Sequence, residues 1–422
     1  MNSKGKSSAA TGGESTLVPK LRFPEFREAD GWETAPGDEL FQQVNNREAP
    51  TGLPILAITQ EHGAIPRHMI DYHVSVTDKS LETYKEVRPG DFIISLRSFQ
   101  GGIEFSEYHG ICSPAYVILR KRGRLSDVFY RQNFKSHEFI QQLTKNLEGL
   151  RDGKMISYKQ FSELRLLKPA FPEQQKIADC LDSVDTLIGA QGRKVEALKA
   201  HKKGLMQQLF PEEGETQPRL RFPEFEGLGE WKERTLSQVV NVASGQVDPT
   251  ESPYSDMPHI GGEDIESENV RLEAGNSARE LGLISGKYLF DRGHVLYSKI
   301  RPALNKVVLP DFEGICSADI YPIRPIKNRM SRRFLAYLLS SETFVKYAKK
   351  HSDRSKIPKI NRESLLAYAS GVPSLPEQQR IADCLTSLDD IIAAESQKLV
   401  ALTIHKKGLM QQLFPSVEDA DA

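Results

Sequence analysis

The chain has 422 residues, of which 39% are hydrophobic and 27% charged, and its formal net charge is -1. This length is enough for two or three domains, and no apolar run approaches the roughly 18 to 20 residues of a membrane helix. The net charge excludes a uniformly basic surface but allows local basic patches. Residues 1–16 are small and polar without the apolar core of a secretion signal, so we expect a disordered tail and a cytoplasmic protein.

The first recognisable element is a short motif that occurs twice. PKLRFPEF begins at Pro19 and PRLRFPEF at Pro218, and each is followed by a tryptophan, Trp32 and Trp231. A second duplication closes each half with a segment of 40 residues that ends in HKKGLMQQLFP. Its two copies align without a gap and are roughly two-thirds identical. The chain is therefore a repeated unit.

Between these motifs lie two regions that match only faintly. GICS recurs at Gly110 and Gly314, and the apolar run from Gly90 corresponds to the run from Gly293. Short β-rich runs alternate with helical stretches, which is typical of α/β or α+β domains. We expect one fold, built twice, with two different surfaces.

The repeated segments have the apolar spacing of long helices that pack as a coiled coil. Prolines mark their ends, so we expect helices over 172–211 and 376–415, each roughly 55 Å long. We predict that the two helices pack on each other in an antiparallel pair with pseudo-two-fold symmetry, the alternative being that each packs on its own domain. The predicted seam comprises Ile177, Leu181, Val184, Ile188, Leu198, Leu205, Ile381, Leu385, Leu388, Ile392, Leu402 and Leu409.

Polar residues interrupt the seam at matching positions of the two copies, with lysines at Lys202 and Lys406. Such residues fix helix register at some cost in stability. Gly204 and Gly408 lie inside otherwise strong helices, and we interpret them as sites of close helix contact.

Basic residues gather in the same part of each repeat. Residues 120–168 contain twelve Lys or Arg against five Asp or Glu, and residues 292–359 contain fifteen against five. Two basic faces suit a protein that contacts DNA phosphates at two places, although a solvated basic helix face is the simpler alternative. The candidate DNA-binding residues are Arg97, Ser98, Gln100, Arg151, Lys154, Lys299, Arg301, Asn305, Lys306, Arg354 and Lys356.

Signatures of catalysis are missing from the sequence. There is no phosphate-binding glycine loop, no amino-methyltransferase motif and no convincing nuclease cluster. The four cysteines lack CxxC spacing, so we expect no zinc or other metal site and no disulfide. We therefore predict a protein without catalytic residues, with a self-contained DNA methyltransferase or nuclease as the rival hypothesis.

The LRFPEF opening, the PEQQ[KR]IADCL helix start and the HKKGLMQQLFP helix end, each present twice, resemble the specificity subunit of Type I restriction-modification systems. The resemblance covers about Leu17 to Pro415 and implies two target recognition domains separated by helical spacer regions. The implied boundaries are a tail at 1–16, recognition domains at 17–170 and 213–375, helical regions at 171–212 and 376–415, and a tail at 416–422. One departure is His294, which replaces the acidic residue found at Asp91.

The resemblance also implies partners. A protein of this family binds double-stranded DNA, assembles with two modification (adenine methyltransferase) subunits and recruits restriction subunits, with no membrane association. S-adenosylmethionine, ATP and Mg²⁺ are then expected in those partners and no cofactor in this chain. Two alternatives stay open: recognition subunit of a system whose partner fuses methyltransferase and nuclease, or a coiled-coil scaffold without DNA contact.

Overall fold

The computed structural model describes residues 17–70, 81–145, 156–353 and 356–416. The chain forms two compact units. Unit 1 contains the residues up to Gln191 and those from Lys398 onward, and unit 2 is Gly192–Gln397. The predicted tail at 1–16 and, of the predicted tail at 416–422, residues 417–422 lie outside the described residues. Both divisions between the units fall inside long helices, so each unit holds one globular region and half of each helix.

Unit 1 is built around a four-stranded antiparallel sheet in the order β2-β9-β6-β7. Its strands are β1 (Glu33–Pro36), β2 (Phe41–Val44), β3 (Leu56–Thr59), β4 (Gly63–Pro66), β5 (Lys85–Val87), β6 (Phe92–Ile94), β7 (Glu104–Phe105), β8 (Gly110–Cys112), β9 (Val117–Lys121) and β10 (Arg165–Lys168). Its short helices are η1 (Pro24–Phe26), α1 (Gly37–Leu40), η2 (Arg67–Met69), α3 (Ser98–Gly101), α4 (Asp127–Asn133), α5 (His137–Lys145) and α6 (Tyr158–Ser162).

Unit 2 repeats this plan, with a four-stranded sheet in the order β12-β18-β15-β16. Its strands are β11 (Lys232–Thr235), β12 (Val240–Val242), β13 (His259–Ile260), β14 (Tyr288–Phe290), β15 (Val295–Ser298), β16 (Val307–Val308), β17 (Gly314–Cys316), β18 (Ile320–Pro325) and β19 (Ala369–Val372). Its short helices are η3 (Pro223–Phe225), α8 (Leu236–Val239), η4 (Tyr254–Asp256), η5 (Pro302–Leu304), α9 (Arg332–Ser340), α10 (Glu342–Lys350) and α11 (Arg362–Ala367).

The duplicated GICS motif has the same structural role in both units. It begins β8 in unit 1 and β17 in unit 2. A side chain at Gly110 would approach the Pro54 carbonyl oxygen to 2.6 Å, and one at Gly314 would approach the Pro258 oxygen to the same distance. Only glycine fits such a close backbone approach. The predicted fold class, two α/β domains and two long helices, is confirmed.

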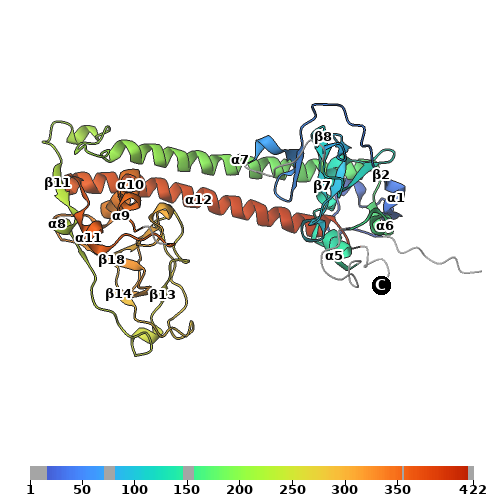
Figure 1. The fold of residues 1–422 in the computed structure, drawn as a ribbon. Helices are drawn as coiled ribbons and strands as arrows, with labels where there is room; N and C mark the ends of the chain where they lie inside the picture. The colour runs from blue at the N-terminus through green and yellow to red at the C-terminus, as the bar shows by residue number, and fades with distance from the viewer. Residues whose placement is uncertain (1–16, 71–80, 146–155, 354–355, 417–422) are drawn as a thin grey trace, which may run out of the picture. The chain divides into compact units, whose positions relative to one another are not determined.

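The two long helices are α7 (Phe171–Leu209) and α12 (Leu375–Leu413), and they pack together (Figure 1). In unit 2, Lys194 Nζ lies 2.5 Å from Glu395 Oε1 and Lys202 Nζ lies 2.6 Å from Asp389 Oδ1. From the first ion pair to the second, the residue number increases along α7 and decreases along α12. The helices therefore run antiparallel, as predicted.

The predicted seam residues are all buried or half-buried, but Ile177, Leu181, Ile381 and Leu385 belong to the cores of their own units. Ile177, Leu181, Val184, Ile381 and Leu385 are buried, and the remaining seven are half-buried. The helix ends also enter the globular cores: Leu413 and Phe414 join the core of unit 1, and Leu209 and Phe210 join that of unit 2.

The interpretation of the two helix glycines is wrong. A Cβ atom added at Gly204 or Gly408 would meet nothing within 4 Å. Neither glycine therefore permits a close contact, and both positions have room for a larger residue.

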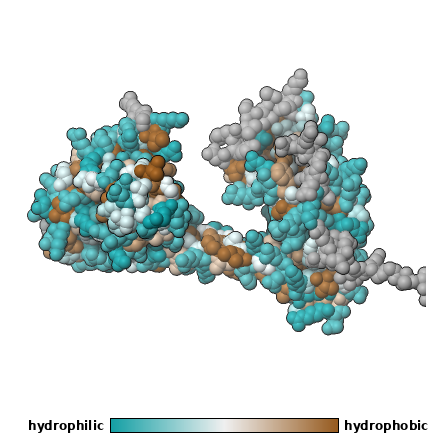
Figure 2. Space-filling view, turned by 90° about the horizontal axis from the view of Figure 1, so that it is seen from below, coloured by the Kyte–Doolittle hydropathy of each residue, from teal (hydrophilic) through white to brown (hydrophobic). Residues whose placement is uncertain are grey.

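Figure 2 shows one face of the molecule, on which hydrophilic residues prevail and hydrophobic residues form only small separate patches. No helix within the described residues combines the length and the apolar character needed to span a bilayer.

Candidate nucleic-acid interface and its helical frame

Two polar clusters fix the register of the helix pair. In unit 2, Asp389 binds Lys202 and also accepts a hydrogen bond from the Tyr337 hydroxyl at 2.7 Å. In unit 1, Asp185 binds Lys406 at 2.7 Å and accepts from Gln132 Nε2 at 2.7 Å. Each cluster joins α7, α12 and a domain helix, α9 or α4. The seam lysines thus contact the opposite helix, and the aspartates link this contact to the domain.

The opening motif forms a second link between domain and helix. Arg22 binds both oxygens of Glu173 at 2.8 Å and donates to the carbonyl oxygens of Ala29 and Asp30. In unit 2, Arg221 binds Glu377 at 2.7 and 2.9 Å and donates to the Leu228 and Gly229 oxygens. A bidentate guanidinium-carboxylate pair is geometrically specific.

The backbone of the same motif reaches the end of the other long helix. Leu21 N donates to Gln412 O at 3.0 Å, and Leu220 N donates to Gln208 O at 2.9 Å. The motif therefore ties the start of one long helix to the end of the other inside each unit.

The glutamine of the PEQQ motif has a structural role as well. Gln174 Oε1 accepts from Ser126 N at 3.0 Å, and Gln378 Oε1 accepts from Ser331 N at 2.7 Å. Ser126 and Ser331 are the N-caps of α4 and α9. The repeated motifs therefore encode the frame that holds each domain on the helices.

The loop after β6 in unit 1 contains three predicted DNA-binding residues. Arg97 and Gln100 are exposed, and neither side chain has a partner among the described residues. Ser98 is 1% exposed and its hydroxyl accepts from Ser95 N at 2.8 Å. Ser98 therefore shapes the loop, and its position does not support the predicted DNA contact.

The loop after β15 in unit 2 contains four more of the predicted DNA-binding residues. Arg301 is exposed, lies in the left-handed region with φ of 47°, and its side chain has no partner in the described part of the chain. Lys299 Nζ donates to Ala318 O at 2.7 Å and Lys306 Nζ to Gly262 O at 2.6 Å. Asn305 Nδ2 donates to Ser340 O at 3.0 Å. Lys306 and Asn305 thus hold the loop, while Arg301 points to solvent.

The structure says less about the four remaining predicted DNA-binding residues. Arg151, Lys154 and Arg354 lie outside the described residues. Lys356 is exposed, and its side chain has no partner in the described ranges.

Ion pairing changes the interpretation of the basic clusters. In unit 1 part of the cluster is neutralised: Arg120 pairs with Asp91, Lys121 with Asp127, Arg131 with Glu107 and Asp182, Lys135 with Glu104, and Lys168 with Glu39. Arg122, Arg124 and Lys159 are exposed and form no ion pair with the described residues. In unit 2, Arg301, Lys356 and Lys359 remain exposed, with side chains that pair with none of the described residues. Exposed cations without an ion pair to the described residues therefore remain in both units.

The substitution at His294 is compensated nearby. In unit 1, buried Asp91 accepts two hydrogen bonds of 2.7 Å from Arg120. In unit 2, Asp291 pairs with the matching Arg324, and His294 Nδ1 lies 3.1 Å from Asp291 Oδ1. Burial lowers the pKa of His294. In unit 2 the carboxylate that pairs with the arginine therefore lies three residues earlier in the sequence, at Asp291, and the ion pair is present in both units.

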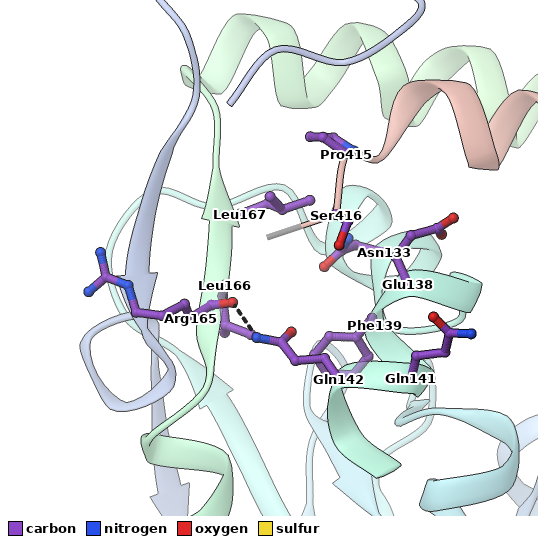
Figure 3. Close-up of a pocket in the computed structure, with 10 residues that line it drawn as sticks. All are labelled: Asn133, Glu138, Phe139, Gln141, Gln142, Arg165, Leu166, Leu167, Pro415 and Ser416. Carbon is purple, nitrogen blue, oxygen red and sulfur yellow. Dashed lines mark hydrogen bonds between the residues drawn. The ribbon is translucent and has the colours of Figure 1, made fainter. Parts of the chain in front are cut away.

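A pocket in unit 1 lies beside the end of α12, where Gln142 Nε2 donates to Arg165 O at 3.1 Å (Figure 3). Its free volume of about 30 Å³ matches a single water molecule.

Sequence reasoning missed the partners of the seam lysines and of the motif arginines, including Asp185, Asp389, Glu173 and Glu377. The duplication could have identified these acidic residues, because each of them occupies the same position in both helix copies.

Residues 229–403 match the family model of the Type I restriction modification DNA specificity domain. Over 174 residues the chain is 33% identical to the Type I restriction enzyme EcoDI specificity subunit of Escherichia coli, an alignment that covers 41% of this chain and 38% of that protein. Over 421 residues it is 25% identical to the Type I restriction enzyme MjaVIII specificity subunit of Methanocaldococcus jannaschii, and 93% of each chain is covered.

Solved structures show a similar fold. The S subunit of a Type-I restriction-modification system from M. genitalium matches with a TM-score of 0.53 and 16% identity, covering 94% of this chain and 99% of that one. A chain from a structure on complex assembly and conformational transition of the type I R-M system matches with a TM-score of 0.55 and 16% identity, covering 91% and 98%.

The duplicated unit and its helical frame agree with these likenesses in fold. Residues 229–403 thus match a Type I DNA specificity domain, and the relatives named here are Type I specificity subunits, in agreement with the resemblance of the repeated motifs.

Proposed function

We propose that each unit reads one half of an asymmetric, bipartite DNA site and that the paired helices set the spacer between the halves. The observation that carries this proposal is a common frame with two different loops. Arg97 and Arg301 are each the third residue after a central strand, β6 or β15, and both are exposed. The residues around them differ, so the two units present different surfaces to DNA.

The frame also supports binding of two copies of one partner. The pair Lys202–Asp389 and the pair Lys406–Asp185 occupy equivalent positions in the two units, and internal two-fold repetition offers the same surface twice. We propose that two modification subunits dock on these helices and that restriction subunits join the complex.

In this proposal the chain itself performs no catalysis. Methylation with S-adenosylmethionine, and cleavage with ATP and Mg²⁺, take place in the partner subunits. This assignment follows from the sequence, which lacks a nucleotide-binding or methyltransferase motif.

A domain exchange tests modular recognition. Residues 17–170 are replaced by the corresponding region of a relative, and the methylated sites of cells that carry the system are mapped. We expect one half of the target to change while the other half and the spacer stay the same. A change in both halves would contradict the proposal.

A further inference from the structure

Unit 2 contains an open pocket beside the Arg301 loop. Its free volume is about 280 Å³, several times the roughly 30 Å³ that one water molecule occupies in the liquid. The lining residues are Lys299, Tyr321, His351, Ser352, Asp353, Lys359, Ile360 and Asn361.

Backbone hydrogen bonds join the described part of the pocket wall to the loop with Arg301. Arg301 N donates to Pro358 O at 2.7 Å, and Ile360 N donates to Lys299 O at 3.0 Å. Asp353 Oδ1 accepts from Lys359 N at 3.2 Å. The pocket wall and the loop with Arg301 are therefore one connected structure.

The aromatic ring in the pocket is not available to stack on a base. Tyr321 is 6% exposed, with the Lys299 ammonium 5.4 Å from its ring centroid and the Arg362 guanidinium at 5.9 Å. A base binder would need an exposed ring face. The pocket is therefore suited to a charged group.

Free donors remain on the pocket wall. Lys359 is exposed, and its ammonium has no partner among the residues described. Asn361 Oδ1 caps α11 by accepting from Ser364 N at 2.7 Å, which leaves its Nδ2 group free to donate. Lys299 adds a half-buried positive charge, partly balanced by Asp319 at 3.6 Å. An ammonium and an amide on one wall suit an anion with several acceptor oxygens.

We propose that this pocket binds one phosphodiester group of the DNA backbone through Lys359 and Asn361. The proposal rests on the proposed DNA-reading function and adds where unit 2 holds the duplex. A phosphate contact carries no sequence information itself but fixes the position from which neighbouring residues reach base edges. Bound here, the backbone lies next to Arg301, whose guanidinium can pair with a guanine edge.

The test uses the full chain in complex with its modification subunits and a duplex that carries the target found by mapping methylated sites. Lys359→Met removes the charge with little change of shape. We expect affinity for target and unrelated duplex to fall by the same factor, about five to ten, and the salt slope to fall by about 0.9. Lys327→Met is the control, because Lys327 is exposed but does not line the pocket.

A scan with single neutral methylphosphonates then locates the phosphate. In the wild-type complex one position should weaken binding by about tenfold, and in Lys359→Met the same position should cost less than twofold. Asn361→Asp keeps the cap of α11 and replaces the donor by a carboxylate, so it should weaken binding more than Lys359→Met.

Four outcomes would overturn the proposal. If the salt slope is unchanged in Lys359→Met, or if no methylphosphonate position is coupled to Lys359, phosphate binding in this pocket is refuted. Neither result contradicts the proposed DNA-reading function. Competition by inorganic phosphate without any coupled DNA position would show a site for the free ion. A wild-type complex that does not prefer its target over unrelated duplex refutes the proposed function as well.

Discussion

Lys202 on α7 and Asp389 on α12 form an ion pair of 2.6 Å that holds the two antiparallel helices of unit 2 in register. Their side chains are only 12% and 13% exposed. Burial raises the pKa of the Tyr337 hydroxyl, which remains protonated and donates to the same carboxylate. Asp389 thus depends on two donors from two different elements.

Removing one partner of this pair should destabilise unit 2. Lys202→Met leaves the Asp389 charge poorly compensated, so we expect the free energy of unfolding to fall by about 1 to 3 kcal/mol. Urea unfolding measures the loss. Lys203→Met, at an exposed neighbour, should have little effect. The double variant Lys202→Met/Asp389→Leu should recover at least half of the loss, and no recovery would contradict an electrostatic cause.

The arginine of the opening motif should not tolerate lysine. Arg221 contacts both oxygens of Glu377 and two carbonyl oxygens, and lysine cannot reproduce this planar set of donors. We expect Arg221→Lys to destabilise unit 2 by about 1 to 3 kcal/mol. Arg219→Lys is the matched control, since Arg219 forms an exposed ion pair with Glu212. Equal effects of the two substitutions would argue against a role of the bidentate pair.

The two helix glycines should be replaceable. Because a Cβ at Gly204 or Gly408 meets open space, alanine at either position should stabilise the protein by roughly 0.5 to 1 kcal/mol. Gly110→Ala should instead destabilise the protein, since its Cβ would lie 2.6 Å from the Pro54 oxygen. Thermal melting of the three variants checks both signs. A loss of stability in Gly204→Ala would point to a contact that the described residues do not show.

Acid should weaken unit 1 through Glu86. A hydrogen bond from Arg88 lowers the pKa of this carboxyl to about 2, with support from His109 and Asn46. A carboxyl with a lowered folded-state pKa contributes stability above its unfolded pKa, near 4.5, and loses it as the pH falls toward 2. We expect Glu86→Gln to be less stable at pH 7 and to show a smaller loss between pH 4.5 and 2 than the parent. Denaturant unfolding across that range compares the two, and parallel pH curves would contradict the prediction.

The helix pair can be tested as a spacer ruler, on the basis of the proposed function. Seven residues inserted after Ala190 and seven after Gln397 lengthen both helices by about 10 Å, or about three base pairs, while the polar contacts inside each unit stay paired. Three base pairs also rotate the duplex by about 100°, so methylation of the native target should fall sharply. It should recover, if at all, on a target with the same half-sites and a longer spacer. Full methylation at the native spacing by a folded variant would show that the helices do not set it.

The sequence alone determined the duplication, the two long helices and the absence of catalytic motifs. These follow from repeated residues and from apolar spacing along the chain, which are local properties. Of the residues predicted for the seam, Ile177 and Leu385 are buried, and each belongs to the core of its own unit.

Only the tertiary structure decided which polar residues are available. Ser98 and Asn305 looked like DNA contacts because both are polar and follow strands, but each one anchors its own loop. Part of the basic cluster of unit 1 is neutralised by carboxylates far away in sequence, such as Asp91 for Arg120. Charge counts cannot predict these pairings, because burial and distance in space decide whether a cation is free, and both depend on contacts between remote parts of the chain.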